Sequence, residues 1–219
     1  MKYTLTYLDK KEIAENTFEF IFSKPTDFNY CAGQFISAYV NGEMREFTLV
    51  SSPRQNVISF STRIRSSLFK DCLMKLQAGD SITIEGPFGR FVLSKNNSRA
   101  VFLVGGIGVT PLVSMIRSGL EKAIILYSFR NDPAYINLIK DSDNELHCFQ
   151  TSGMLSQCLD GFSERISLTI LDKILPLENK NSLQFYVSGT ADFVSAMISF
   201  LFELNISEKA IVTDSFGSY

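Results

Sequence analysis

The stretch that decides the fold is Val104-Gly105-Gly106-Ile107-Gly108-Val109-Thr110-Pro111. An apolar run at residues 100–104 leads into it and is typical of a buried parallel strand. Thr110 is placed to act as an N-cap, and Pro111 suits the first position of a helix because its missing N–H costs nothing there. Apolar residues then recur at helical spacing, at Leu112, Val113, Met115, Ile116 and Leu120. We therefore predict a strand, a glycine-rich turn and a helix.

The glycines of this turn predict a site for a pyrophosphate. Without a Cβ they let the backbone approach a ligand, and a helix start offers free N–H groups and the positive end of a dipole. Gly106 and Gly108 fit the dinucleotide fingerprint G-x-G-x-x-G, but Pro111 occupies the third glycine position. The acidic residue expected about 20 residues later is not clearly placed. A tight turn without a ligand is the alternative interpretation.

The composition is that of a soluble globular enzyme or binding module. The chain has 219 residues, of which 45% are hydrophobic and 20% are charged, enough for one or two domains. A net charge of −2 argues against nucleic acid as a partner. Residues 1–12 lack the apolar core of a signal peptide, and the longest apolar tract, 100–116, is interrupted by glycines and Pro111. We expect a cytoplasmic protein with no membrane span.

The cysteines and the single histidine do not form a pattern of metal ligands. Cys31, Cys72, Cys148 and Cys158 are scattered, with no C-x-x-C pair, so we expect reduced thiols and no iron–sulfur cluster. His147 cannot form a histidine-rich site by itself, and we assign it a structural role in a strand. We expect no metal site.

The two halves of the chain differ in their element pattern. Strand-like segments in the first half are short and separated by turns such as Asn41-Gly42, which predicts a small antiparallel Greek-key β-barrel. Ser67 is the expected cap of a helix at 68–76. The expected strands lie at 17–22, 35–40, 47–50, 57–64 and 81–84.

After the polar loop at 94–98, strands and helices alternate, which predicts a parallel α/β sheet. We therefore divide the chain into domains 1–97 and 98–219. The expected strands of the second domain are 100–104, 123–129, 145–151, 185–187 and 210–213, and the expected helices are 111–121, 133–140, 169–175 and 191–204.

A second constellation, Arg45-Glu46-Phe47-Thr48, lies in the barrel half. Along a strand, Arg45 and Phe47 share one face and Thr48 lies on the other. A cation, an aromatic ring and a hydroxyl at this spacing would serve a flavin, by charge on phosphate, by ring stacking and by a hydrogen bond to the ring. The alternative is an exposed charge beside a core aromatic residue.

Taken together, the chain resembles the ferredoxin–NAD(P)H reductase superfamily of flavoproteins over nearly its full length. Four segments carry the resemblance, in the family's order: Gly33-Gln34-Phe35, Arg45-Glu46-Phe47-Thr48, Gly86-Pro87-Phe88-Gly89-Arg90-Phe91 and Gly105-Gly106-Ile107-Gly108-Val109-Thr110-Pro111. The resemblance implies FAD in the first domain and NADH or NADPH in the second.

The resemblance also implies roles in flavin binding. Arg45 would neutralise the flavin phosphate, Phe47 would lie against the isoalloxazine, and Thr48 would hydrogen-bond near N5, where hydride arrives. Ser66 or Ser67 would contact the pyrophosphate, although Ser67 would equally serve as a helix cap. Relatives often have a glycine shortly before this serine, whereas this chain has Arg65 close by instead. The implied flavin-binding set further includes Leu49, Val50 and Gly86.

Other residues would serve the nicotinamide. The implied dinucleotide-binding residues are Gly105, Gly106, Gly108, Thr110, Pro111 and Gly189. Phe185-Tyr186-Val187-Ser188-Gly189-Thr190 resembles the family's Tyr-x-Cys-Gly-Pro segment, so Ser188 would take the place of a cysteine beside the nicotinamide. Phe216 or Tyr219 would cover the flavin until the nicotinamide displaces it, or would only pack where the two domains meet. Arg130 is the one candidate for a 2′-phosphate, and we favour NADH.

The implied function is that of an FAD-dependent oxidoreductase. Hydride would pass from NAD(P)H to bound FAD, with Thr48, Ser188 and Phe216 at the reacting rings. Electrons would then pass to a separate acceptor such as a ferredoxin, a flavodoxin or an oxygenase component. Two alternatives stay open, namely a reductase of free flavin and a non-catalytic nucleotide-binding module.

Overall fold

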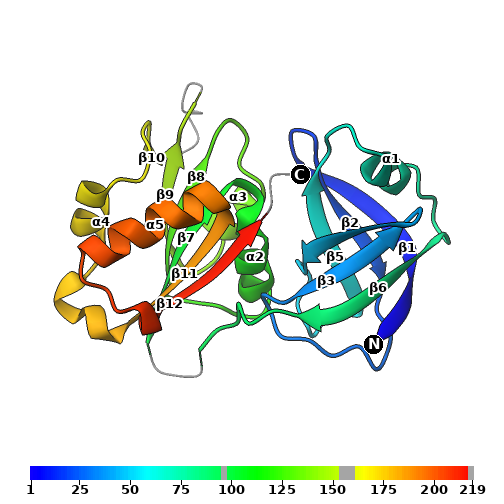
Figure 1. The fold of residues 1–219 in the computed structure, drawn as a ribbon, viewed down its shortest axis with the longest axis horizontal. Coiled ribbons are helices and arrows are strands. Elements are labelled where there is room, and N and C mark those ends of the chain that lie inside the picture. The colour runs from blue at the N-terminus through cyan, green and yellow to red at the C-terminus, as the bar shows by residue number, and fades with distance from the viewer. Residues whose placement is uncertain (95–97, 153–160, 217–219) are drawn as a thin grey trace. The chain divides into compact units, whose positions relative to one another are not determined.

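A computed structural model describes residues 1–94, 98–152 and 161–216 of the chain (Figure 1). Residue contacts divide the chain into two compact units. The first comprises Met1–Val92 together with Thr110–Gly119, and the second comprises Leu93–Val109 and Leu120–Tyr219. The helix that follows the glycine turn therefore packs with the first unit.

The first unit is an antiparallel sheet that curls into a barrel-like form, as predicted. Within the described residues its six strands follow the order β4-β3-β6-β1-β2-β5, and each neighbouring pair is antiparallel. A bridge between Leu49 and Phe60 joins the end of β4 to β5, so the two outer strands meet. The strands are β1 (Lys2–Ala14), β2 (Thr17–Ser23), β3 (Phe35–Val40), β4 (Glu43–Thr48), β5 (Val57–Arg63) and β6 (Ser81–Phe88).

Three strands differ from the expectation. Strand β1 was not predicted, although Tyr3, Leu5 and Tyr7 alternate with polar residues at its start. Strand β4 begins at Glu43 and ends at Thr48, whereas we expected residues 47–50. Strand β6 continues to Phe88, so Gly86 lies inside a strand, where an added Cβ would come within 3.1 Å of the side chain of Ile36. The Gly-Pro-Phe part of the Gly86–Phe91 segment therefore forms the end of a strand.

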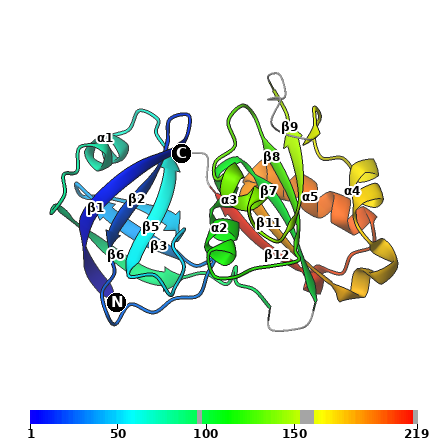
Figure 2. The same cartoon turned by 180° about the vertical axis from the view of Figure 1, so that it is seen from behind.

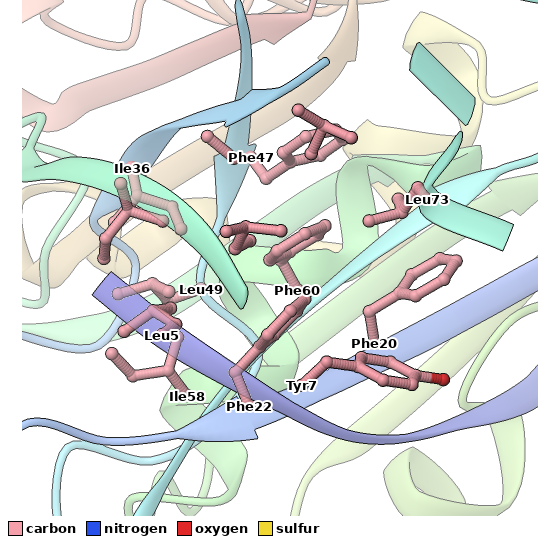
Figure 3. Close-up of a cluster of buried hydrophobic side chains, with 14 of the residues drawn as sticks. Leu5, Tyr7, Phe20, Phe22, Ile36, Phe47, Leu49, Ile58, Phe60 and Leu73 are labelled. Atoms are coloured by element: carbon pink, nitrogen blue, oxygen red, sulfur yellow. The ribbon is translucent and has the colours of Figure 1, made fainter. Parts of the chain in front are cut away.

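Aromatic rings fill the core of the first unit (Figure 3). The ring of Phe60 stacks on Phe47, with centroids 4.4 Å apart, and on Phe22 at 5.4 Å. Helix α1 (Leu68–Met74) adds Phe69 and Leu73 to this core. Burial of such rings stabilises the barrel, because each ring removes a large apolar area from water.

Helix α2 (Thr110–Ile116) is attached to the barrel strands by buried polar contacts. Just beyond the helix, the guanidinium of Arg117 donates to both carboxylate oxygens of Glu19, at 2.7 and 3.0 Å. The hydroxyl of Ser114 donates to the carbonyl oxygen of Ser51 at 2.7 Å, and the hydroxyl of Tyr30 donates to the same oxygen at 3.0 Å. This network explains why α2 groups with the first unit.

The burial of Tyr30 in this network predicts that the free energy of unfolding depends on pH. Burial raises the pKa of Tyr30 to about 12, against the opposing effects of the Ser51 hydrogen bond and Arg117. The unfolded phenol titrates near its ordinary value of about 10. Because the folded pKa is the higher one, the stability contributed by the neutral phenol is complete below about pH 10 and is lost as the pH rises towards 12. Urea unfolding measures the difference in free energy of unfolding between the unsubstituted protein and Tyr30→Phe. This difference should shrink above pH 10, and a difference that stays constant would contradict the prediction.

The second unit is a parallel sheet, as predicted. Among the described residues its order is β10-β9-β8-β7-β11-β12, and every pair is parallel. Ile170, Leu171, Met197 and Leu201 of α4 and α5 pack on one face of this sheet. The sheet comprises β7 (Arg99–Gly105), β8 (Ile124–Phe129), β9 (Glu145–Gln150), β10 (Gly161–Phe162), β11 (Leu183–Thr190) and β12 (Ile211–Phe216); the α-helices are α3 (Ile136–Lys140), α4 (Leu168–Ile174) and α5 (Ala191–Glu203), and the 3-10 helices are η1 (Gly106–Val109), η2 (Leu177–Ser182) and η3 (Glu208–Ala210).

The two faces of this sheet carry different helices. Figure 1 shows α5 lying across one face, and Figure 2 shows the sheet from behind, with α3 on that side. Tyr127 faces α3, since its hydroxyl donates to the carbonyl oxygen of Ala134 just before that helix. Helices on both faces are the usual covering of a parallel sheet.

The glycine turn differs from its predicted form. The chain enters the 3-10 helix η1 at Gly106, and α2 follows without a break, so Thr110 is already helical and is not an N-cap. The helix also ends at Ile116, which leaves Leu120 outside it. The prediction was wrong here because the first helical turn is built from the glycines themselves, whose spacing gives no apolar periodicity.

Two further observations concern membrane-spanning helices and metal ligands. Within residues 1–94, 98–152 and 161–216, no helix has the length and apolar character needed to cross a membrane. In that same part of the chain, no group of three or more His, Cys, Asp or Glu side chains is arranged to hold a metal ion. His147 lies in β9, with its Nε2 atom 3.0 Å from Oε1 of Glu145.

Candidate functional site

Arg45 and Phe47 lie on one face of β4, as the alternation of the strand predicts. Both contact the ring of Phe69 in α1: the guanidinium carbon of Arg45 is 5.7 Å from its centroid, and the Phe47 ring is also at 5.7 Å. The Arg45 guanidinium pairs with the carboxylate of Glu43 at 2.9 Å and donates to the carbonyl oxygen of Met44 at 2.7 Å. An arginine held beside an aromatic wall is suited to an anionic group on a flat ligand.

Phe47 is also a core residue. Its ring is 8% exposed and lies nearly parallel to Phe60, at an interplanar angle of 16°. Phe47 therefore packs as the core aromatic residue of the alternative interpretation. Its predicted contact with the isoalloxazine stays a prediction.

Thr48 carries an unusual polar atom. The residue is 3% exposed, and its Oγ1 atom has no hydrogen-bond partner among the described residues. A buried hydroxyl left without a partner costs about 1–3 kcal/mol, so such atoms are rare and need an explanation. A ligand that offers a hydrogen bond would offset this cost. Thr48 therefore fits its predicted role towards a flavin ring.

Lys70 is a functional candidate that was not predicted from the sequence. It is 9% exposed, and its ammonium donates to the carbonyl oxygen of Arg63 at 2.8 Å. Burial lowers the pKa of Lys70, and the nearby charges of Arg65 and Arg45 lower it further. Cations so close together favour binding of an anion such as phosphate. The available signal was a lysine between Phe69 and Leu73 on the buried face of a short amphipathic helix.

The two candidate serines differ in their surroundings. The Oγ atom of Ser67 accepts a hydrogen bond from the backbone N–H of Lys70 at 3.3 Å, so it caps α1 as the alternative interpretation predicts. Ser66 is exposed. Any contact of either hydroxyl with a pyrophosphate stays a prediction.

Leu49 and Val50 are buried, and their backbone N–H groups are already used. Leu49 donates to the carbonyl oxygen of Gln34 at 2.9 Å, and Val50 donates to that of Ser59 at 2.8 Å. The carbonyl oxygen of Val50 also accepts from Arg117 at 3.3 Å. Both residues therefore shape the strand end after Thr48, and their contribution to flavin binding stays a prediction.

The three positions of the turn require glycine for different physical reasons. An added Cβ at Gly105 would lie 2.9 Å from the ring of Phe193, and one at Gly108 would lie 2.6 Å from the carbonyl oxygen of Ser188. At Gly106 nothing lies within 4 Å of an added Cβ, but φ is +54°. Packing within the protein gives Gly105 and Gly108 a reason of their own, and among the three glycines only Gly106 has open space beside it in the described part of the chain. That all three make room for a ligand stays a prediction.

Ser188 is buried at the carboxyl end of β11. Its hydroxyl donates to the carbonyl oxygen of Gly108 at 2.6 Å, and the residue is 0% exposed. Gly189 follows, where an added Cβ would lie 2.8 Å from the Phe193 ring. The hydroxyl that we expected beside a nicotinamide is thus bonded to the glycine turn.

The remaining predicted residues divide between the units. Thr110 and Pro111 are buried in α2, which packs with the first unit. Phe216 is half-buried at the end of β12, where it pairs in register with Thr190 of β11. Tyr219 lies outside the described residues.

The carboxyl ends of the parallel strands bring several polar groups to one edge. In open α/β sheets this is the edge at which ligands bind. Gln150, at the end of β9, is 5% exposed, and its Oε1 atom has no hydrogen-bond partner in the described part of the chain. Arg130 is exposed after β8. Gln150 was not predicted, because a single glutamine in a strand carries no signal of its own.

An antiparallel barrel-like unit followed by a parallel sheet with a glycine turn is the architecture of the two-domain flavoprotein reductases. Residues 4–93 match the family described as oxidoreductase FAD-binding domain. The flavohem-like FAD/NAD binding domain of nitric oxide dioxygenase from Vibrio cholerae shares the fold with a TM-score of 0.85 at 19% identity, over 98% of both chains. Ferredoxin-NADP+ reductase from Plasmodium falciparum has a TM-score of 0.80 at 16% identity, covering 98% of this chain and 96% of that one.

Among curated proteins, a component of the Na(+)-translocating NADH-quinone reductase of Psychrobacter cryohalolentis is 23% identical over 215 residues. That alignment covers 86% of this chain and 52% of the relative, and the chain spans about half the length of the curated relatives it matches. Residues 4–93 thus match an oxidoreductase FAD-binding domain, and the chain shares the fold of the two-domain flavoprotein reductases. FAD and a nicotinamide dinucleotide are the cofactors of this class.

Proposed function

We propose that this chain is a reductase that takes hydride from NADH or NADPH onto bound FAD and passes electrons to a separate protein acceptor. The observation that carries the proposal is the buried, unpartnered hydroxyl of Thr48, one residue after Phe47 and three after Arg45 in an FAD-binding domain. When bound, the flavin supplies hydride acceptance and one-electron release. The acceptor is a small electron-transfer protein such as a ferredoxin or flavodoxin, or an oxygenase component.

The residues of the first unit divide the work of holding the cofactor. Arg45 brings a fixed positive charge that attracts a phosphate. Lys70 adds a second, partly desolvated cation close by. Thr48 presents a hydroxyl that can donate or accept, while the rigid stack of Phe47 on Phe60 fixes the strand from which it projects.

In the second unit, the turn at Gly106 holds the dinucleotide. Its φ of +54° and the open space beside its Cα allow close approach of a diphosphate to the backbone. NADH is the preferred donor, because Arg130 is the single basic residue placed after the second strand and no arginine adjoins Thr151-Ser152-Gly153. The scattered cysteines of the sequence support a cytoplasmic location.

Flavin binding tests this proposal directly. The purified chain, incubated with FAD and passed through gel filtration, should retain the flavin and its visible absorbance. Loss of all flavin with continued NAD(P)H-dependent flavin reduction would indicate a free-flavin reductase. Nucleotide binding with no flavin binding or reduction would indicate a non-catalytic module. The ratio of kcat/KM for NADH and NADPH measures donor preference, and a higher value for NADPH would overturn the choice of NADH.

The Thr48→Val substitution keeps the side-chain shape and removes the unpartnered hydroxyl. We expect the free energy of unfolding of the FAD-free protein to stay the same or rise by about 1 kcal/mol, because a buried unsatisfied group is removed. FAD affinity should fall about tenfold, since one hydrogen bond to the ligand is lost. Urea unfolding and fluorescence titration with FAD measure the two effects.

Thr17→Val is the matched control for this substitution. Thr17 is 6% exposed, but its hydroxyl donates to the carbonyl oxygen of Glu15 at 3.0 Å. Its replacement should lower stability and leave FAD affinity unchanged. Equal FAD affinity of Thr48→Val and the unsubstituted protein would show that the Thr48 hydroxyl does not bind FAD, and the proposal would lose its main support.

A further inference from the structure

Ser188 connects two segments that lie 80 positions apart in the sequence. Its hydroxyl donates to the carbonyl oxygen of Gly108 at 2.6 Å, at the end of β11 where that strand pairs with β7 through Ser188 and Val104. The residue is completely buried. The hydroxyl therefore has its one donor committed to the turn.

The turn and the strand end are packed without room to spare. An added Cβ at Gly108 would lie 2.6 Å from the Ser188 carbonyl oxygen and 2.7 Å from the backbone N of Gly189. The ring of Phe193 crowds two more glycines. An added Cβ would lie 2.9 Å from this ring at Gly105 and 2.8 Å from it at Gly189. Phe193 is itself placed by the first turn of α5, where its N–H donates to the Thr190 hydroxyl at 3.4 Å. These contacts leave Gly106 as the member of the turn beside open space.

We propose that Ser188 is a positioning residue for the dinucleotide turn and does not contact the nicotinamide. Its hydrogen bond to Gly108 fixes the backbone path of η1, so that the backbone around Gly106 is held ready for the diphosphate of the ligand. The inference rests on the proposed function, because it assigns the diphosphate of a nicotinamide dinucleotide to this turn. It predicts that Ser188 affects binding of any ligand that carries the diphosphate, whether or not a nicotinamide ring is present.

Binding of two ligands separates positioning from direct contact. Isothermal titration calorimetry of the FAD-loaded protein with NAD+ and with ADP-ribose, which lacks the nicotinamide, measures both affinities. For Ser188→Ala we expect both to weaken by the same factor, about tenfold, as for loss of one buried hydrogen bond. Weakening confined to NAD+ would show a nicotinamide contact, and unchanged affinity for both ligands would show no role in binding. Either result overturns the inference.

A readout without ligand tests the same claim. In Ser188→Ala, hydrogen exchange of the amides in Gly106–Val109 should become faster, because the turn has lost its tether. Ser188→Cys fills the space of the hydroxyl with a weak donor, so it should resemble the alanine variant. If cysteine instead restores both affinities and the slow exchange, volume and not the hydrogen bond holds the turn, and the inference is wrong.

Ser142→Ala is the matched control in the same unit. Ser142 also donates from its hydroxyl to a carbonyl oxygen at 2.6 Å, that of Ile139, but it lies after α3. Its replacement should leave both affinities and the exchange of Gly106–Val109 unchanged. The two failures are distinguishable, since no binding of either ligand by the unsubstituted protein contradicts the proposed function. Normal binding by Ser188→Ala contradicts only the role of Ser188.

Discussion

Gly108→Ala is expected to unfold at a markedly lower temperature and to lose dinucleotide binding. The new Cβ would lie 2.6 Å from the carbonyl oxygen of Ser188 and 2.7 Å from the backbone of Gly189. These are backbone atoms of a sheet strand, so no side-chain rotation relieves the clash. Overpacking of this kind costs about 1–3 kcal/mol or more. Because the turn must move away from β11, we also expect affinity for NAD+ to fall by more than tenfold.

Gly106→Ala provides the contrast within the same turn. Its Cβ meets nothing within 4 Å, so the cost is limited to the φ of +54°, about 1–2 kcal/mol. The methyl group nevertheless enters the open space assigned to the ligand, so NAD+ affinity should fall while the protein folds. Thermal unfolding and NAD+ titration of both variants measure the difference. Unfolding of Gly108→Ala at the unsubstituted temperature would contradict the packing described for this turn.

Arg117→Met is expected to destabilise the first unit by about 3–5 kcal/mol, the cost of leaving a buried charge uncompensated. The side chain of Glu19 is 7% exposed and that of Arg117 is 21% exposed, and the guanidinium contacts both carboxylate oxygens. Glu19 also accepts from the hydroxyl of Ser59 at 2.6 Å, which holds the carboxylate in place when its partner is lost. Urea unfolding measures the loss.

An exposed ion pair of similar length supplies the control. Arg99 and Glu145 are 2.8 Å apart, but their side chains are 41% and 45% exposed, so Arg99→Met should cost less than about 1 kcal/mol. In the double variant Glu19→Gln with Arg117→Met, part of the loss should be recovered, because no buried charge remains. Equal effects of Arg117→Met and Arg99→Met would mean that the Glu19 pair behaves as a surface pair.

The fold was predictable where the pattern is local. Alternation and β-rich composition predicted β2, β3 and β5, and the apolar runs before and after the glycine turn predicted the parallel strands β7 and β8. Strand β10, with two residues, is too short for any periodicity. The attachment of α2 to the first unit depends on Arg117 and Glu19, which are 98 positions apart and carry no common signal in the sequence.

The candidate site was predictable in composition but not in contacts. Arg45, Phe47 and Thr48 were identified from their spacing and their resemblance to a flavin motif. That the Thr48 hydroxyl is buried without a partner in the described chain, and that Ser188 bonds to Gly108, depends on tertiary packing. Lys70 was missed for the same reason, because its burial against β5 is set by the docking of α1 and not by its neighbours in sequence.

Reduction of bound flavin by a nicotinamide is tested most directly by anaerobic mixing of the FAD-loaded protein with NADH in a stopped-flow spectrometer. We expect the visible absorbance of the oxidised flavin to disappear, with a rate that saturates as NADH is increased, and we expect Thr48→Val to slow this step. Flavin that stays oxidised at saturating NADH and at saturating NADPH would contradict the proposal that this chain is a nicotinamide-dependent flavin reductase.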